Sequence, residues 1–229
     1  MTDTAKRTFT GFINETLTFF RDVHANNSKA WFEDHRDDYN RYVMTPFKQL
    51  VTDLAPTMLK IDPFMEVRPA VNKTISKIHR DTRFSNDKTL FKQNMWLTFK
   101  RPSEDWKVAP AFYFELFPDW YRYGMGYYSA TRADMNRLRE AIDNFPGEFL
   151  NVTAFLRETE FFTLHGDEYK RPIPSDHPDE IQTWYQRKSF YVSCDKQIEE
   201  VVFSAALVDE LAERFLMMSS LYQYLMDLQ

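Results

Sequence analysis

Residues 111–128 read AFYFELFPDWYRYGMGYY, and this stretch decides the fold class. Between residues 112 and 117, Phe112, Phe114 and Leu116 alternate with a second set of side chains that includes Glu115. This period of two predicts a β-strand. The aromatic run 120–128 predicts a second strand. Because no helix separates the two runs, we expect them to pair antiparallel.

Further strands are expected on both sides of this hairpin. Residues 75–80 and 95–100 show the same alternation, and residues 161–164 and 190–194 are short candidates. In the first of these, a regular strand would place Lys77 and His79 on one face with Ile75.

Helical periodicity occupies both ends of the chain. Before the strands, apolar residues recur at helical spacing from Phe12 to Phe20, a second helix has Asn27 or Ser28 at its start, and a third begins near Pro46. After the strands, signals for helix starts occur at Thr131, Pro146 and Pro178. A last helix is predicted to run unbroken from Ser204 through the apolar positions 207, 211, 215, 218, 221 and 225.

Helices, then strands, then helices indicate an α+β fold. We expect a single domain over residues 1–229, in which an antiparallel sheet from the middle of the chain is packed by N-terminal and C-terminal helices. The most loop-like stretch, 172–178, is too short to be a domain linker.

Composition excludes several classes of protein. The 229 residues are 43% hydrophobic and 28% charged, which is ordinary for a globular domain. The single cysteine, Cys194, offers no disulfide framework. No run of about 18 apolar residues could span a bilayer, and the first residues lack a signal-peptide core. These features predict a cytoplasmic protein without a membrane partner.

Glycine is scarce, and this excludes the common nucleotide-binding loops. The five glycines do not form a P-loop. The closest approach to a dinucleotide-binding fingerprint is Gly124-x-Gly126, in which Tyr127, Tyr128 and Ser129 occupy positions that require small residues. A strand edge or bulge is the better interpretation of this pair, and no cofactor is predicted.

The charge of the chain is unevenly distributed. Residues 73–101 contain eight basic and two acidic residues, so that this basic segment carries +6 within a chain of net charge −5. The remainder therefore carries −11. Local attraction of an anion is compatible with this distribution, whereas affinity for a long nucleic-acid backbone is disfavoured.

The basic segment contains the candidate binding residues. Two guanidinium groups offer forked donors suited to phosphate or carboxylate, lysines add point charges, and an aspartate can orient them. The candidates are Lys77, Arg80, Asp81, Arg83, Lys88 and Lys92. The alternative is a salt-bridge network that only pins a corner between a strand and a loop.

Other chemistry-bearing residues are less constrained. His177 follows Asp176 in a proline-rich loop and is added to the candidate ligand-binding set, since an aspartate can orient a histidine. A turn that leads into a helix explains the same residues. Glu115 could act as an acid or pair with Lys77 or Arg80 across the sheet.

Metal and nucleic-acid sites have little support. The five histidines are scattered and show no metal-ligand spacing, so no metal is predicted. Phe84, Phe91 and Trp96 interleave with the basic segment, as base-stacking side chains do, but a place in the core explains them equally. Ser85 lacks the glycine-flanked turn of a serine nucleophile.

Three stretches resemble the bacterial family catalogued as domain of unknown function 2461. The longest is ISKIHRDTRFSNDK at residues 75–88, which continues through Lys92 and is similar to the family's I-x-[KR]-I-x-R-D-x-R-F-S-x-D-K core. The second is Trp31-Phe32-Glu33 after Asn26 and Asn27, and the third joins Arg171-Pro172, Asp176-His177-Pro178 and Lys188. Gly124-x-Gly126 also fits.

The likeness spans roughly residues 12–225 and departs from the family at one point. Residues 88–92 read KTLFK where the family often has Lys-Thr-Pro-Tyr-Lys, so a role for Leu90 or Phe91 is in doubt. The resemblance implies one α+β domain and carries over no activity and no catalytic residue.

Taken together, these observations predict a cytoplasmic domain that binds a small, phosphate-like anion in a basic cleft. One alternative is a non-catalytic domain whose basic segment contacts an acidic protein surface or nucleic acid. The other is a purely structural charge network with the function elsewhere. Neither the reaction nor the oligomeric state follows from the sequence.

Overall fold

The computed structural model describes residues 7–83, 86–102 and 109–229. They form two compact units, each built from several segments of the chain. The first unit comprises Met1–Phe99, Tyr113–Arg122 and Asp195–Glu213, and the second comprises Lys100–Phe112, Tyr123–Cys194 and Arg214–Gln229. The assignment of residues 1–229 to one domain stays a prediction.

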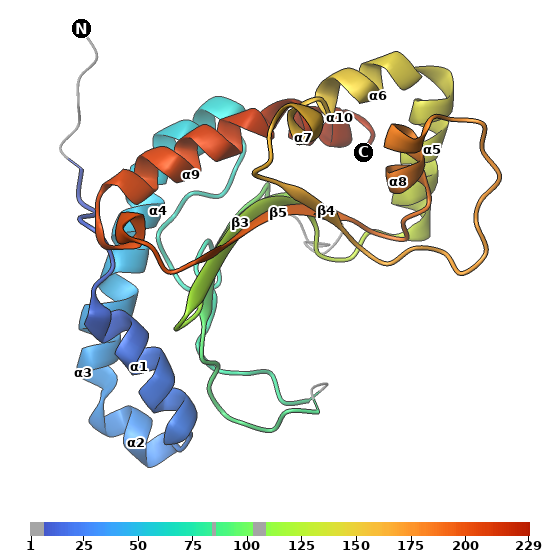
Figure 1. Ribbon diagram of the computed structural model, residues 1–229. Coiled ribbons are helices and arrows are strands. Elements are labelled where there is room, and N and C mark those ends of the chain that lie inside the picture. The colour runs from blue at the N-terminus through green and yellow to red at the C-terminus, as the bar shows by residue number, and fades with distance from the viewer. Residues whose placement is uncertain (1–6, 84–85, 103–108) are drawn as a thin grey trace, which may run out of the picture. The chain divides into compact units, whose positions relative to one another are not determined.

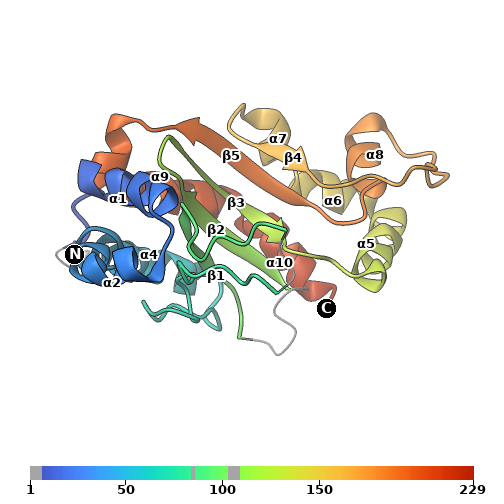
Figure 2. The same cartoon turned by 90° about the horizontal axis from the view of Figure 1, so that it is seen from below.

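The strands form one antiparallel sheet in the order β1-β2-β3-β5-β4 (Figure 2). Their bounds are Met95–Phe99 for β1, Pro110–Leu116 for β2, Trp120–Tyr127 for β3, Thr163–His165 for β4 and Tyr191–Gln197 for β5. A tight turn joins β2 to β3, in which the Phe117 amide donates to the Trp120 carbonyl at 2.9 Å. The α+β class, with a central sheet flanked by N-terminal and C-terminal helices, is confirmed.

The first unit contains the N-terminal helices, which lie together in Figure 1. They are α1 (Asn14–Ala25), α2 (Lys29–Asp34), α3 (Arg36–Asp38), the π-helix η1 (Tyr39–Met44) and α4 (Thr45–Ile61). Ser28 caps α2 by accepting a hydrogen bond from the Trp31 amide at 3.3 Å. A short 3-10 helix, η2 (Glu200–Phe203), leads into α9 (Ala206–Met217), whose last turn belongs to the second unit.

The alternation in β2 sorts its side chains between the two faces of the sheet. Phe112, Phe114 and Leu116 are fully buried. In the first unit, Phe114 stacks on Phe12 with ring centroids 6.0 Å apart and also contacts Phe47 of α4. Side chains at positions 113 and 115 therefore point to the opposite face, which we call the open face.

The second unit contains the helices that follow β3. They are α5 (Arg132–Asn144), α6 (Pro146–Val152), α7 (Phe155–Glu158), α8 (Asp179–Tyr185) and α10 (Ser219–Asp227). Thr131 and Asp134 form the expected capping box of α5, and Pro146 begins α6. Gly126 lies within β3, where an added Cβ would approach the Tyr191 backbone to 2.4 Å. This close contact between strands explains that glycine.

Two expectations about secondary structure are wrong. The last helix is not continuous, because it breaks at Met218 into α9 and α10. Ser219 Oγ donates to the Leu216 carbonyl at 2.7 Å, and such a local bond competes with the helical pattern. Residues 75–80 make only isolated bridges, Ile75 with Leu97 and His79 with Phe91.

The period of two also fails in this segment. Ile75 and Ile78 are both 2% exposed, whereas Lys77 and His79 face solvent. The buried positions are thus three residues apart, and burial of Ile78 overrides the alternation that the sequence suggests.

Candidate functional site

The basic segment folds as an irregular hairpin, so that the two ends of its long loop meet. The Arg80 amide donates to the Leu90 carbonyl at 2.8 Å, and the Lys92 amide donates to the Ile78 carbonyl at 2.9 Å. Nearer β1, the Ser76 amide donates to the Trp96 carbonyl at 2.9 Å. This pairing brings Arg80 and Lys92 together, although they are twelve positions apart in the sequence.

Arg80 is held in place by the other end of the loop. Its Nη2 lies 3.0 Å from Asp87 Oδ2, and its Nε donates to Thr89 Oγ1 at 3.1 Å. Asp87 also accepts from the Thr89 amide at 2.9 Å, which closes a turn. The Arg80 side chain is 27% exposed. The guanidinium is therefore oriented by the loop and still reaches solvent.

The remaining cations of the loop are solvated. Arg83 donates to Asp81 through Nε at 2.9 Å and Nη2 at 2.7 Å, and the two side chains are 77% and 55% exposed. Hydrogen bonds from the side chain and backbone of Arg83 hold the pKa of Asp81 well below its usual range. Lys88 donates to the Thr82 carbonyl at 2.8 Å, and Lys77 is exposed. The predicted residues Phe84 and Ser85 lie outside the described residues.

Lys92 has a different environment from these exposed cations. Its Nζ lies 3.8 Å from the centroid of the Trp96 ring, a cation–π contact, and its side chain is half-buried. Burial lowers the pKa of Lys92 to about 8, and the positive charge of Arg80 acts in the same direction. The negative charge of Glu115 raises this pKa and so partly opposes both effects. Within residues 7–83, 86–102 and 109–229, its ammonium group makes no hydrogen bond or ion pair.

A polar trio lies next to Lys92 on the open face. Asn94 Nδ2 donates to Glu115 Oε1 at 2.5 Å, and Arg122 donates to Glu115 Oε2 through Nε at 2.7 Å. Arg122 Nη2 approaches the same oxygen to 2.6 Å. Burial raises the pKa of Glu115, and the charge and hydrogen bonds of Arg122 and Asn94 counteract this rise.

Aromatic side chains surround these polar groups. The Arg122 guanidinium carbon lies 5.6 Å from the Trp120 ring centroid and 6.0 Å from that of Tyr113. Aromatic walls reduce access of water and so strengthen electrostatic interactions between the charges. We refer to Lys92, Asn94, Trp96, Glu115 and Arg122 as the open-face cluster.

The sequence located part of this cluster. Lys92 and Glu115 were both candidates, but the expected partners of Glu115, Lys77 and Arg80, are replaced by Arg122 and Asn94. The signal for Arg122 was available. It alternates with the buried Tyr121 and Tyr123 on β3, and so faces the same side as Glu115 on the neighbouring strand.

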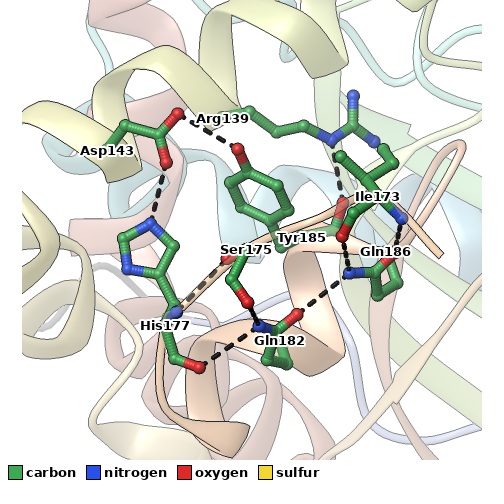
Figure 3. A network of polar contacts seen from close by, with 8 residues as sticks. All are labelled: Arg139, Asp143, Ile173, Ser175, His177, Gln182, Tyr185 and Gln186. Atoms are coloured by element: carbon green, nitrogen blue, oxygen red, sulfur yellow. Dashed lines mark hydrogen bonds and ion pairs between the residues drawn. The ribbon is translucent and has the colours of Figure 1, made fainter.

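His177 belongs to the second unit and does not pair with Asp176. Its Nε2 donates to Asp143 Oδ1 at 2.8 Å, and Tyr185 donates its hydroxyl to Asp143 Oδ2 at 3.0 Å (Figure 3). Burial raises the pKa of Tyr185, as does its hydrogen bond to Asp143. Asp143 instead projects toward the ring from α5 (Figure 3).

The same network fastens a loop to α8. Gln182 Nε2 donates to the carbonyls of Ser175 at 2.8 Å and His177 at 3.2 Å. Gln186 exchanges two hydrogen bonds with the backbone of Ile173, at 2.8 and 2.9 Å (Figure 3). Amide side chains thus replace strand pairing for a loop that has no sheet partner of its own. We call the residues drawn in Figure 3 the loop clamp.

A buried arginine completes the loop clamp. Arg139 is 6% exposed and donates to the carbonyls of Tyr185 at 2.8 Å and Arg187 at 2.6 Å. Its third contact is with Asn136 Oδ1 at 3.2 Å. These carbonyls terminate α8, where a cation is favourable.

Two of the stretches quoted from the sequence meet in the first unit. Asn27 Oδ1 accepts from the amides of Leu90 and Phe91 at 2.7 and 3.0 Å, and Phe32 stacks on Phe91 with centroids 4.4 Å apart. Phe91 is 2% exposed. Its aromatic ring is therefore part of the core that holds the hairpin against α2, and this role needs no hydroxyl group.

Two further classes of site find no support in the described part of the chain. No three histidine, cysteine, aspartate or glutamate side chains there come together as metal ligands. None of its helices is both long enough and apolar enough to span a bilayer.

The fold and the open-face cluster define an α+β protein with a charged and aromatic site on one face of an antiparallel sheet. The chain belongs to the family described as conserved hypothetical protein (DUF2461), whose profile matches residues 15–224. The same family was indicated by the residues of the basic segment. A comparison with curated proteins gives no match.

Proposed function

We propose that the protein binds a small anionic ligand, carrying a phosphate or carboxylate group, at Lys92 on the open face. The supporting observation is the environment of the Lys92 ammonium group. It is half-buried, contacts the Trp96 ring, and makes no hydrogen bond or ion pair with the described side chains. A buried charge is costly unless it is paired, and an anionic ligand would supply the missing partner.

Arg80 supports the same proposal. Its positive charge acts on Lys92, so the two cations contribute to one positively charged region. Asp87 and Thr89 orient the guanidinium, as expected of a donor prepared for a ligand. A phosphate or carboxylate that contacts both cations would relieve their mutual repulsion.

The other predicted residues receive different parts in this proposal. Lys77, Arg83 and Lys88 are exposed and would attract an anion at long range without contacting it. Asp81 would orient only Arg83. His177 makes its ring contact with Asp143 in the second unit and is not assigned to the ligand. We further propose that the protein has no nucleic-acid partner, because the chain outside the basic segment carries −11. We also propose a cytoplasmic location.

The exposed cations favour one alternative, a non-catalytic domain that contacts an acidic protein surface. Arg83 is 77% exposed on a loop, as is typical of a rim residue in a protein interface. Such a partner would depend on Arg83 and Lys88 and would be sensitive to salt. The small-anion proposal depends on Lys92 instead.

Thermal unfolding in the presence of candidate anions tests the proposal. Inorganic phosphate, pyrophosphate, citrate and sugar phosphates would be compared on the wild type, Lys92→Met and Arg83→Ala. A ligand at about 100 times its Kd adds roughly 2.7 kcal/mol of stability. We expect at least one anion to raise the melting temperature of the wild type and of Arg83→Ala, and to leave Lys92→Met unchanged.

Lys92→Met is a suitable variant because methionine preserves the apolar stem against Trp96 and removes only the charge. An equal shift for Lys92→Met and the wild type would contradict the proposal. Loss of the shift in Arg83→Ala alone would favour the acidic-partner alternative.

A further inference from the structure

We propose that Lys92 is a nucleophilic amine that forms a Schiff base with the carbonyl group of an anionic aldehyde or ketone. This inference rests on the proposed anion site and names the class of ligand that it accepts. Lys92 Nζ lies 3.8 Å from the centroid of the Trp96 ring and makes no ion pair with a carboxylate in the described part of the chain.

A lysine must lose its proton before it can attack a carbonyl carbon. Desolvation and a neighbouring cation are the two means by which proteins promote this loss. Lys92 has both, because its side chain is half-buried and Arg80 lies nearby. The pKa of Lys92 is therefore lowered to about 8. At pH 7, an amine with this pKa is unprotonated roughly 300 times more often than one at the ordinary 10.5.

The exposed lysines of the basic segment lack this environment. Lys77 faces solvent, and Lys88 donates to the Thr82 carbonyl at 2.8 Å. They share the sequence neighbourhood of Lys92 and differ from it in burial, which makes them internal controls for any reaction of an amine.

Glu115 supplies the group that can move protons during the reaction. Its carboxylate acts electrostatically on Lys92, and it is oriented by Asn94 and Arg122 through 2.5 and 2.7 Å hydrogen bonds. A carboxylate offers about four acceptor positions, and Arg122 Nη2 at 2.6 Å takes a third, so about one position is left open. A carboxylate of raised pKa is suited to take up and release a proton.

The reaction balances without an oxidant or a reductant. The Nζ lone pair forms a bond to the carbonyl carbon, and the carbon–oxygen π bond becomes a lone pair on oxygen. Glu115 relays the two hydrogens of the neutral amine to that oxygen. The remaining carbon–oxygen bond then breaks, water leaves, and a carbon–nitrogen double bond remains. Arg80 would hold the anionic group of the substrate during these steps.

Reductive trapping tests this inference on the full chain. The protein is mixed at pH 7 with substoichiometric pyridoxal 5′-phosphate, an anionic aldehyde, and reduced with sodium borohydride. Peptide mass spectrometry then measures the label on each lysine. We expect Lys92 to carry about tenfold more label than Lys77 or Lys88, because the anion site would hold the aldehyde beside a half-buried amine, whereas the other two lysines are exposed. Pyridoxal, which lacks the phosphate, should label Lys92 less.

The pH dependence gives a second readout. Labelling of Lys92 should rise with pH and level off above a pH of about 8. In Glu115→Gln, trapping at Lys92 should slow by about tenfold or more, since glutamine cannot relay a proton. Equal labelling of the three lysines in the wild type would overturn the inference.

Lys92→Arg tests whether the label is on this amine, because arginine cannot form the imine and the variant should lose the label. The thermal shift of the wild type with phosphate tests the anion site separately. If phosphate stabilises the wild type while Lys92 stays unlabelled, only the Schiff-base inference fails. If phosphate has no effect and Lys92 stays unlabelled, the anion site fails as well.

Discussion

The open-face cluster and the loop clamp both contain a histidine or lysine near a carboxylate, yet they differ in how fully their charges are satisfied. In the loop clamp, Asp143 accepts from His177 and Tyr185, and Arg139 reaches three acceptors. In the open-face cluster, Glu115 is satisfied by Asn94 and Arg122, but Lys92 has no anion bound to it in the described residues.

This difference distinguishes a structural network from a candidate binding site. Buried polar groups in a folded protein are normally paired, so a complete network is explained by stability alone. A half-buried cation without an anionic partner lowers stability. An anionic ligand that pairs with Lys92 would account for such an arrangement.

The largest effect is expected from Arg139→Ala in the loop clamp. Removal of the guanidinium leaves the carbonyls of Tyr185 and Arg187 without their donor and empties a buried site. Unfolding in urea should show a loss of about 3 kcal/mol.

Arg137→Ala is the matched control on the same helix, since its partner Asp134 is one turn away and the Arg137 side chain is 46% exposed. It should lose about 0.5 kcal/mol or less. A similarly small loss for Arg139→Ala would mean that the loop clamp does not stabilise the second unit.

Lys92→Met should stabilise the folded protein at pH 7, whereas Arg139→Ala should destabilise it. The folded protein holds a partly desolvated ammonium group, so its removal should raise the free energy of unfolding by about 1 kcal/mol, after allowance for solvent screening and the Trp96 contact. Lys88→Met, at an exposed position, should leave stability within about 0.5 kcal/mol of the wild type.

The gain from Lys92→Met should depend on pH. The pKa of Lys92 is lowered in the folded state to about 8 from an ordinary value of 10.5. Between these values, the unfolded chain binds more protons than the folded one, so wild-type stability rises with pH. The advantage of Lys92→Met should therefore be full below pH 8 and disappear toward pH 10.5. A pH-independent difference would argue against a desolvated amine.

An effect of similar size is expected at the His177–Asp143 contact. The side chains are 18% and 50% exposed, so each of His177→Ala and Asp143→Ala should cost about 1 kcal/mol. The double variant should cost less than the sum, because both changes remove the same hydrogen bond. Strict additivity in this double-mutant cycle would show that the bond contributes nothing in solution.

The smallest effect is expected from Arg83→Ala. Its pair with Asp81 is highly exposed and joins residues two positions apart. Stability should change by about 0.5 kcal/mol or less in urea unfolding. A larger loss of stability would support the alternative, suggested by the sequence, that Arg83 belongs to a structural salt-bridge network.

Residues 75–92 show which features of the site could be predicted from the sequence. The sequence identified the cations and the possible role of each, but not their relative burial. Arg80 and Arg83 are the same residue type three positions apart, yet one is 27% exposed and the other 77%. Chain reversal at the loop decides this, because Arg80 returns against residues 87–89 while Arg83 lies at the loop's exterior.

The partners of Glu115 and His177 show the same limit. The sequence predicted Lys77 or Arg80 of the basic segment as partners of Glu115, and the adjacent Asp176 as the partner of His177. The observed partners of Glu115 and His177 are different residues. Arg122 reaches Glu115 through strand pairing, and Asp143 reaches His177 from α5, 34 residues away. Side-chain pairing over such separations depends on the packing of whole elements.

The sequence by itself determined the α+β class, the strands β2 and β3, the start of several helices and the membership of the family. These follow from local chemistry, namely side-chain periodicity, capping and proline geometry, which act within a few residues. Tertiary structure alone decided the break between α9 and α10, the irregular course of residues 75–80 and the identity of Lys92 as the unsatisfied cation. Burial and charge pairing decide these features, and both depend on residues that are distant in the chain.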